Sequence, residues 1–163
     1  MKTAWSFVCC AALAAGLSGC VSAPAFESVP SSSAPLPYTV VESPERWIDH
    51  PVLWGGMILE VNNFERHTEI EMLAYPLDRR QAPRLEVADE GRFIAILPGY
   101  VEAKDYPAGR FMTLIGRITG ERRGSLRNAP YVWPEVAVER QHLWPRDFRE
   151  PKARFSVGVG VRL

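Results

Sequence analysis

The stretch VLWGGMILEVN, at residues 52–62, decides the fold predicted for this chain. It alternates as a β-strand does, and the apolar residues expected on its buried face are Leu53, Met57, Leu59 and Val61. Gly55 and Gly56 lie in its middle, and glycine inside a strand marks a bend, a bulge or a close backbone approach. A strand that curls around a small barrel needs such a point, so the stretch predicts a strongly curved strand.

Downstream of this strand, the sequence predicts four more strands and one short helix. We expect strands at 68–75, 92–97, 111–119 and 135–143, a helix of one or two turns at 101–106, and a polar loop at 121–128. The second strand has Ile70, Met72 and Ala74 inward, with Glu69 and Glu71 on a solvated outer face. A further alternating stretch at 155–161 predicts a sixth strand or an ordered tail.

The order of these elements indicates a small barrel. Three strands, a short helix and two strands are the arrangement of the OB-fold, a five-stranded Greek-key barrel. An irregular β-sandwich is the alternative. Glycines in the middle of the first and fourth strands favour the barrel, because its wall has to coil there. The predicted class is therefore mainly β, a five- to six-stranded OB-fold-like Greek-key barrel with one short helix.

The first twenty residues have the anatomy of a lipoprotein signal peptide. Lys2 precedes an uncharged run at 4–17, which is too short for a membrane span of about twenty residues. The run ends in Leu17, Ser18 and Gly19, directly before Cys20. This order predicts cleavage before Cys20 and lipid on its sulfur and its new amino group. The alternative, an ordinary secretory signal, would leave a free thiol as the first mature residue.

On this interpretation, the sequence divides into four parts. Residues 1–19 are the predicted signal peptide, 20–44 a lipidated N-terminus with an extended tether rich in proline and serine, 45–145 the barrel, and 146–163 a connector with a further strand. Cys9 and Cys10 leave with the signal peptide, so the mature domain has no free thiol for a disulfide. Val21 rather than aspartate follows Cys20, which favours the outer membrane under enterobacterial sorting rules.

Composition and motifs argue against several functional classes. The net charge of zero does not favour nucleic acid as a partner, because nucleic acid requires a basic face. The scattered histidines His50, His67 and His142 predict no metal site, and no cofactor is expected. Glu69 and Glu71 resemble a catalytic pair only in spacing. We therefore expect no enzyme.

One candidate ligand surface stands out. Tyr131 and Trp133 follow a loop that contains Arg122 and Arg123, and OB-folds use loops and one barrel face to hold extended ligands. Aromatic side chains in this position can stack on a sugar or a peptide. Their plainer role is packing in the core or against loops.

Several longer strings resemble those of a known family. They are VLWGGMILEV at 52–61, YPLD at 75–78, GRFIAILPGY at 91–100, YPAGRFMTLIGRITG at 106–120 and YVWPEVAVERQHLWP at 131–145. These strings occur in this order after a lipobox, and on that basis the chain resembles the Slp family of outer-membrane lipoproteins across 51–145. The resemblance implies an envelope lipoprotein induced by starvation or in stationary phase, and it offers no catalytic residues.

Two functional hypotheses follow. The first is a non-catalytic outer-membrane lipoprotein, anchored by lipid and facing the periplasm, with a structural or stress-adaptive role through an envelope protein or glycan partner. The second is a periplasmic module that binds an oligosaccharide, a peptidoglycan fragment or a peptide. Contiguous exposed aromatic side chains would favour the second, and buried tryptophans with a featureless barrel face would favour the first.

Overall fold

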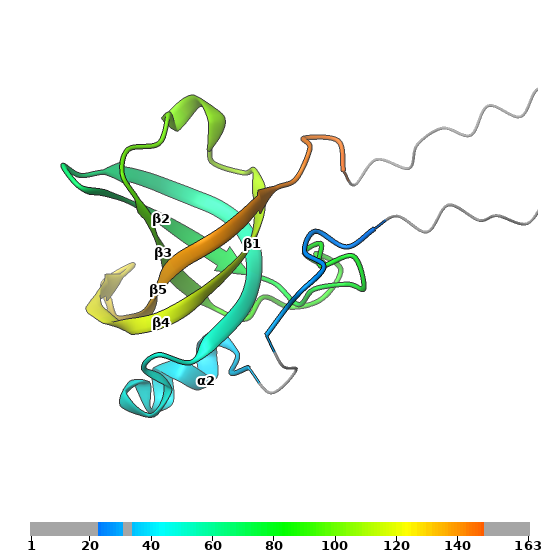
Figure 1. Ribbon diagram of the computed structural model, residues 1–163. Helices are drawn as coiled ribbons and strands as arrows, with labels where there is room; N and C mark the ends of the chain where they lie inside the picture. The colour runs from blue at the N-terminus through cyan, green and yellow to red at the C-terminus, as the bar shows by residue number, and fades with distance from the viewer. Residues whose placement is uncertain (1–22, 31–33, 149–163) are drawn as a thin grey trace, which may run out of the picture.

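A computed structural model describes residues 23–30 and 34–148, and Figure 1 shows the barrel that they form. The elements in chain order are helix α2 (Pro37–Glu42), the 3-10 turn η2 (Pro44–Trp47), strands β1 (Pro51–Asn63), β2 (His67–Ala74) and β3 (Arg92–Pro98), the 3-10 turn η3 (Ala103–Asp105), and strands β4 (Phe111–Leu126) and β5 (Ala129–Leu143). Within these ranges, no helix combines the length and the apolar character that crossing a bilayer requires.

The sheet closes on itself in the order β1-β2-β3-β5-β4. Strands β3 and β5 pair in parallel, and every other neighbouring pair is antiparallel. A five-stranded closed barrel with a short helical turn between β3 and β4 confirms the predicted OB-fold-like class. The turn itself is shorter than expected, because only Ala103–Asp105 is helical.

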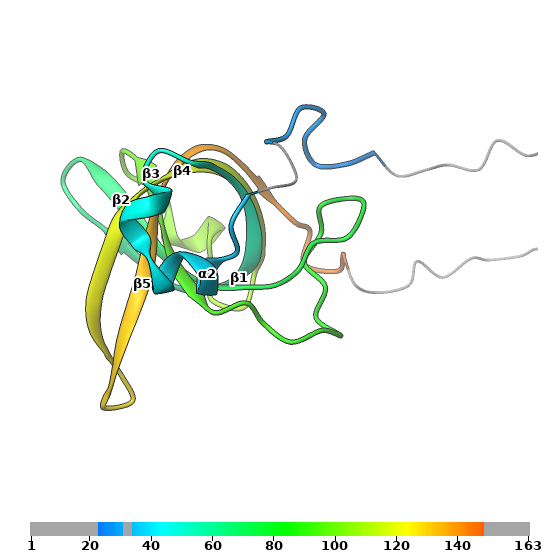
Figure 2. The same ribbon diagram turned by 90° about the horizontal axis from the view of Figure 1, so that it is seen from below.

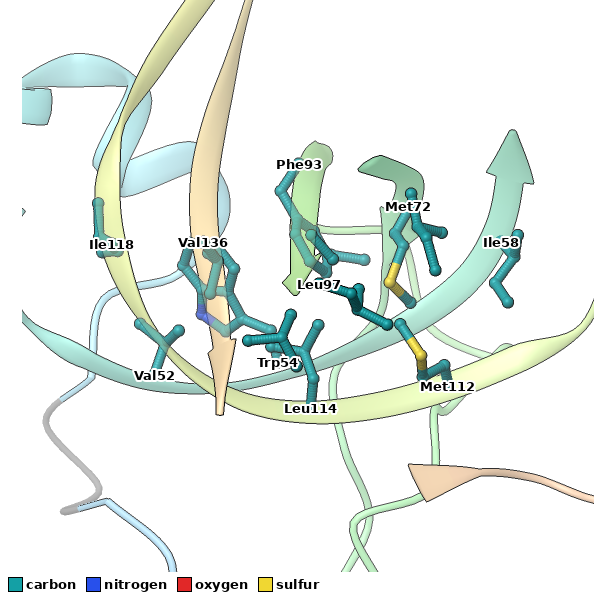
Figure 3. Packing of buried hydrophobic residues seen from close by; sticks show 14 of the residues in the cluster. Val52, Trp54, Ile58, Met72, Phe93, Leu97, Met112, Leu114, Ile118 and Val136 are labelled. Atoms are coloured by element: carbon teal, nitrogen blue, oxygen red, sulfur yellow. The ribbon is translucent and has the colours of Figure 1, made fainter. Parts of the chain in front are cut away.

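Apolar side chains fill the interior of the barrel. Phe93, Met72, Leu97, Met112 and Leu114 are all buried there and point toward one another from different strands (Figure 3). The predicted inward face of β2, with Ile70, Met72 and Ala74, is confirmed. Such an interior is a packed core, whose stability comes from apolar surface removed from water.

The predicted face of the first strand was wrong at Leu53 and Met57, whereas Val61, which follows a register shift in β1, does pack against the core. In β1 the inward residues are Val52, Trp54 and Ile58, whereas Leu53 and Met57 lie on the outside and are half-buried. The outer face of β1 is also apolar, because Met57 packs in a second cluster with Phe111 and Trp144. When both faces of a strand are apolar, the alternation of side chains along it does not show which face lies inside the barrel.

The β4–β5 hairpin is longer than the sequence predicts. The expected polar loop at 121–128 is almost entirely strand, since Glu121–Leu126 pair with Ala129–Pro134 and only Arg127 and Asn128 form the turn. Both turn residues have positive φ, 50° and 67°, as a two-residue hairpin turn that follows the sheet twist requires. The arm extends away from the barrel in Figure 2.

The segment predicted as an extended tether contains ordered structure. Helix α2 begins at Pro37, the first helical position, where the missing N–H costs nothing because that donor has no partner in the helix. Its Val40 is fully buried in the barrel core, and Trp54 Nε1 donates a hydrogen bond to the Pro35 carbonyl at 2.8 Å. The predicted strand at 155–161 and the signal peptide lie outside the described residues.

Candidate functional site

An ion-pair cluster covers the outer face of β2. Arg122, on the β4–β5 arm, binds the Glu69 carboxylate with two hydrogen bonds, Nη1 to Oε2 at 2.5 Å and Nη2 to Oε1 at 2.8 Å. The same guanidinium reaches Glu135 at 2.7 Å. Glu69 is only 8% exposed. The prediction that Glu69 lies on a solvated face was therefore wrong, because Arg122, near the base of the hairpin arm, covers it.

A second set of polar contacts lies beside the first. Glu71 Oε1 accepts hydrogen bonds from Arg92 Nη1 at 2.8 Å and from Trp133 Nε1 at 3.1 Å. Tyr131 accepts one from the Arg92 backbone N–H at 2.9 Å. The Tyr131 and Trp133 rings are 4.6 Å apart at 59°. Both aromatic rings are therefore held in fixed positions.

The charges in this cluster nearly balance. Three carboxylates, Glu69, Glu71 and Glu135, face two guanidinium groups, Arg92 and Arg122, which leaves one negative charge when His67 is neutral. The Arg122 guanidinium lowers the pKa of the Glu69 carboxyl, burial opposes that change, and His67 adds to the lowering. Glu69 in turn raises the pKa of Arg122. A site with this balance does not attract a polyanion.

We expect Glu69→Gln to lower the free energy of unfolding at pH 7 by about 1 to 2 kcal/mol, because the charged Arg122 guanidinium loses the carboxylate that binds it with two hydrogen bonds. The folded-state pKa of Glu69 lies below its usual value of 4.5, so the stabilisation is complete above pH 4.5 and is lost as the pH falls through the folded-state pKa. The difference between variant and wild type should therefore shrink in acid. Urea unfolding of both chains at pH 7 and at lower pH measures it.

Glu139→Gln is the matched control on the same hairpin. Arg117 and Glu139 also pair between β4 and β5, at 3.0 Å, but both side chains are about half exposed. Exposed pairs of this kind contribute less than about 1 kcal/mol. Equal losses in the two variants, or a Glu69→Gln loss independent of pH, would contradict the account of the cluster.

Two hollows flank the four residues predicted as a ligand surface. Arg122 and Trp133 line a small one, of about 150 Å³, together with Asn62, Glu69, Glu71 and Ile94. Tyr131 and Arg123 line a larger groove of about 400 Å³ between helix α2 and the hairpin arm, where the Tyr38 side chain is 54% exposed. The four residues thus divide between two neighbouring hollows.

The tryptophans have different roles. Trp54 and Trp144 are buried, at 3% and 4% exposure, whereas Trp133 and Trp47 are only half-buried. Arg123 is 75% exposed on its side chain and pairs with Glu121. Among the described residues, no three histidine, cysteine or acidic side chains are placed to hold a metal ion.

Sequence reasoning missed Arg92, Glu135 and Tyr38. Arg92 and Glu135 carry no motif, and they join the cluster only because β3 and β5 pair in parallel beside β2. Tyr38 fell within the predicted tether. Leu17, Ser18, Gly19 and Cys20 lie outside the described residues, so their role stays a prediction.

Comparison with known proteins gives a family match along most of the chain. The model of the outer membrane lipoprotein Slp family matches residues 17–158. The chain is 30% identical over 132 residues to the uncharacterized lipoprotein YeaY of Escherichia coli (strain K12), covering 78% of this chain and 66% of that protein. It is 29% identical over 105 residues to the outer membrane protein Slp of the same strain, covering 64% and 55%.

Among solved structures, a small single-stranded DNA-binding protein from Streptomyces coelicolor aligns with 58% of this chain and 94% of its own, at 7% identity and a TM-score of 0.37. So low a score supports no argument about function. The fold assignment rests instead on the strand order of this chain. The chain spans about two thirds of YeaY and about half of Slp.

Proposed function

Because this chain belongs to the outer membrane lipoprotein Slp family, we propose that lipid on Cys20 anchors it in the outer membrane and that its barrel faces the periplasm. The family match confirms the resemblance noted in the sequence and extends beyond it on both sides. It begins at Leu17, so it includes the four residues of the predicted lipobox. That inclusion is the observation that carries the proposal.

The proposed role is structural or stress-adaptive and non-catalytic, exerted through an envelope protein or glycan during starvation or stationary phase. Within the ion-pair cluster, two carboxylates are engaged in a way that does not favour general acid catalysis. Arg122 holds Glu69 as an ion pair with a lowered pKa, and Glu71 is bound by Arg92 and Trp133. A general acid needs the opposite shift, toward the working pH.

We expect Cys20→Ser to abolish anchoring. Without the thiol no lipid can be attached, so the precursor should keep its signal peptide and leave the outer-membrane fraction. Gradient separation of the two membranes, followed by immunoblotting, measures both the size and the location of the chain. Ser22→Ala, which keeps the cysteine, is the control and should behave as wild type. Normal processing and outer-membrane recovery of Cys20→Ser would refute lipid anchoring.

A second candidate function, ligand binding, is favoured by one observation. Trp133 and Tyr131 lie at the junction of the two hollows, with their rings held by Glu71 and Arg92. Fixed aromatic rings beside carboxylate acceptors fit the hydroxyl and amide groups of an oligosaccharide, a peptidoglycan fragment or a peptide. The slightly negative balance of charge does not fit nucleic acid.

Trp133→Ala tests this function. If the barrel binds a muropeptide or a chitooligosaccharide, calorimetric titration should show an affinity reduced about tenfold in the variant, equivalent to 1.4 kcal/mol. Tyr100→Ala is the control, because Tyr100 is 66% exposed in the β3–β4 connection. Binding that is equally weakened by both variants, or untouched by Trp133→Ala, would exclude this surface.

A further inference from the structure

Residues 23–30 are bound to the barrel. The Gln81 side chain pairs with both backbone groups of Phe26, accepting from its N–H at 2.7 Å and donating to its carbonyl at 2.9 Å. Arg140 donates to the Ser28 carbonyl at 2.7 Å, and its guanidinium lies 5.3 Å from the centre of the Phe26 ring. Ala25 donates to the Arg80 carbonyl at 3.2 Å. Three residues, Arg80, Gln81 and Arg140, therefore hold this segment.

The residue that binds Phe26 is itself firmly positioned. Gln81 is 9% exposed, and its backbone has a φ of 65°. This conformation is uncommon for residues other than glycine, asparagine and aspartate. Its carbonyl accepts from Thr113 Oγ1 at 2.7 Å, and Thr113 in turn accepts from Trp144 Nε1 at 2.9 Å. Since Thr113 and Trp144 are also buried, the contact with Phe26 continues into the second apolar cluster.

This contact shortens the path from the lipid to the barrel. Ala25 follows Cys20 by only five residues. Even a fully extended chain of that length spans at most about 18 Å. The tether predicted for 20–44 would have reached about 75 Å at about 3.1 Å per residue. Once Ala25 is bound, the barrel cannot move far from the anchor.

We propose that the bound segment at 25–28 seats the barrel directly on the membrane surface, with the side that carries Ala25 and the β2–β3 loop at 75–91 against the lipid headgroups. This inference rests on the proposed lipidation of Cys20. In both views the described N-terminal segment, the loop at 75–91 and the end of the described chain lie on one side of the barrel, and the β4–β5 hairpin tip lies on the other (Figures 1 and 2). The hairpin arm, with its two hollows, thus points away from the membrane.

Fluorescence energy transfer to the membrane tests this arrangement. The three cysteines of the chain are Cys9, Cys10 and Cys20, so one engineered cysteine is the only thiol left in the lipidated protein. We would label Arg79→Cys, beside the Ala25 contact, or Ser125→Cys, on the hairpin arm, and reconstitute each chain into phosphatidylethanolamine and phosphatidylglycerol vesicles carrying a headgroup acceptor. Transfer from position 79 should exceed that from position 125 by at least about twofold, since the barrel separates them.

Gln81→Gly combined with Arg140→Ala should abolish the difference. Glycine accepts the positive φ at position 81 but removes the side chain that binds Phe26, so the released chain can lift the barrel from the membrane. Circular dichroism is the check that the double variant is folded. If it does not fold, the comparison of positions 79 and 125 in the otherwise unaltered chain still decides the proposal.

The outcomes separate the two proposals. Mass measurement of each reconstituted chain shows whether Cys20 carries lipid, and a chain without lipid would contradict the proposed function itself. Equal transfer from positions 79 and 125 in a chain that does carry lipid would overturn only the seating of the barrel. Stronger transfer from position 79, lost in the double variant, would support it.

Discussion

Gly56→Ala should cost at least about 3 kcal/mol of the free energy of unfolding, at or beyond the upper end for overpacking a core. A Cβ added at Gly56 would lie 2.0 Å from the Leu73 carbonyl oxygen and 2.9 Å from the Ala74 Cα. Those atoms belong to the backbone of β2, which pairs with β1 at this point and cannot move without breaking the sheet. Gly56→Val should prevent folding.

Chemical denaturation of the non-lipidated mature chain, followed by far-UV circular dichroism, measures this cost. Gly120→Ala is the matched control in β4, because its Cβ would meet nothing closer than Glu135 Oε2 at 3.8 Å. We expect Gly120→Ala to be neutral or more stable by up to about 1 kcal/mol. An unchanged midpoint for Gly56→Ala would show that β1 and β2 do not approach as closely as the structure has them.

Trp54→Ala should cost about 3 to 5 kcal/mol, the range for removing a large aromatic side chain from a core. Trp54 is 3% exposed and packs edge-on against Phe93, with ring centres 5.1 Å apart. Its indole N–H also holds the Pro35 carbonyl, so the same side chain ties the start of the ordered N-terminal segment to the barrel. The denaturation assay described for Gly56 measures the loss.

Trp54→Phe separates the two contributions. Phenylalanine keeps most of the buried apolar surface but cannot donate to Pro35, so we expect a loss of about 1 to 2 kcal/mol. It should also increase proteolysis near residue 35 without unfolding the barrel. A cost below about 1 kcal/mol for Trp54→Ala would be inconsistent with a core position.

Much of the barrel could be predicted from local pattern. Gly56 and Gly116 indicated where the wall is crowded, and the structure gives the physical reason, since the Cβ of a residue at 116 would lie 2.3 Å from the Ala137 carbonyl oxygen. The face of β1 could not be predicted, because Leu53 and Trp54 are both apolar and both are covered. The outer face is covered by Ala82 and Leu85 of the β2–β3 loop, whose position in the fold the local pattern does not reveal.

The site was harder to predict than the barrel. Arg122 and Trp133 were identified from their residue types, and they do line one hollow. Their partners Glu69 and Glu71 were assigned to a solvated face, because nothing in a polar stretch such as 121–128 reveals that a hairpin continues through it. The proline-rich composition of 23–44 similarly concealed the contact between Phe26 and Gln81.

Mass spectrometry of the N-terminal peptide of the protein purified from bacterial membranes tests the central claim most directly. We expect the mature chain to begin at Cys20 and to carry a diacylglyceryl group on the sulfur and a third acyl chain on the amino group. A mature N-terminus at any other residue, or a Cys20 peptide of unmodified mass, would contradict lipid anchoring and the membrane-seated barrel that depends on it.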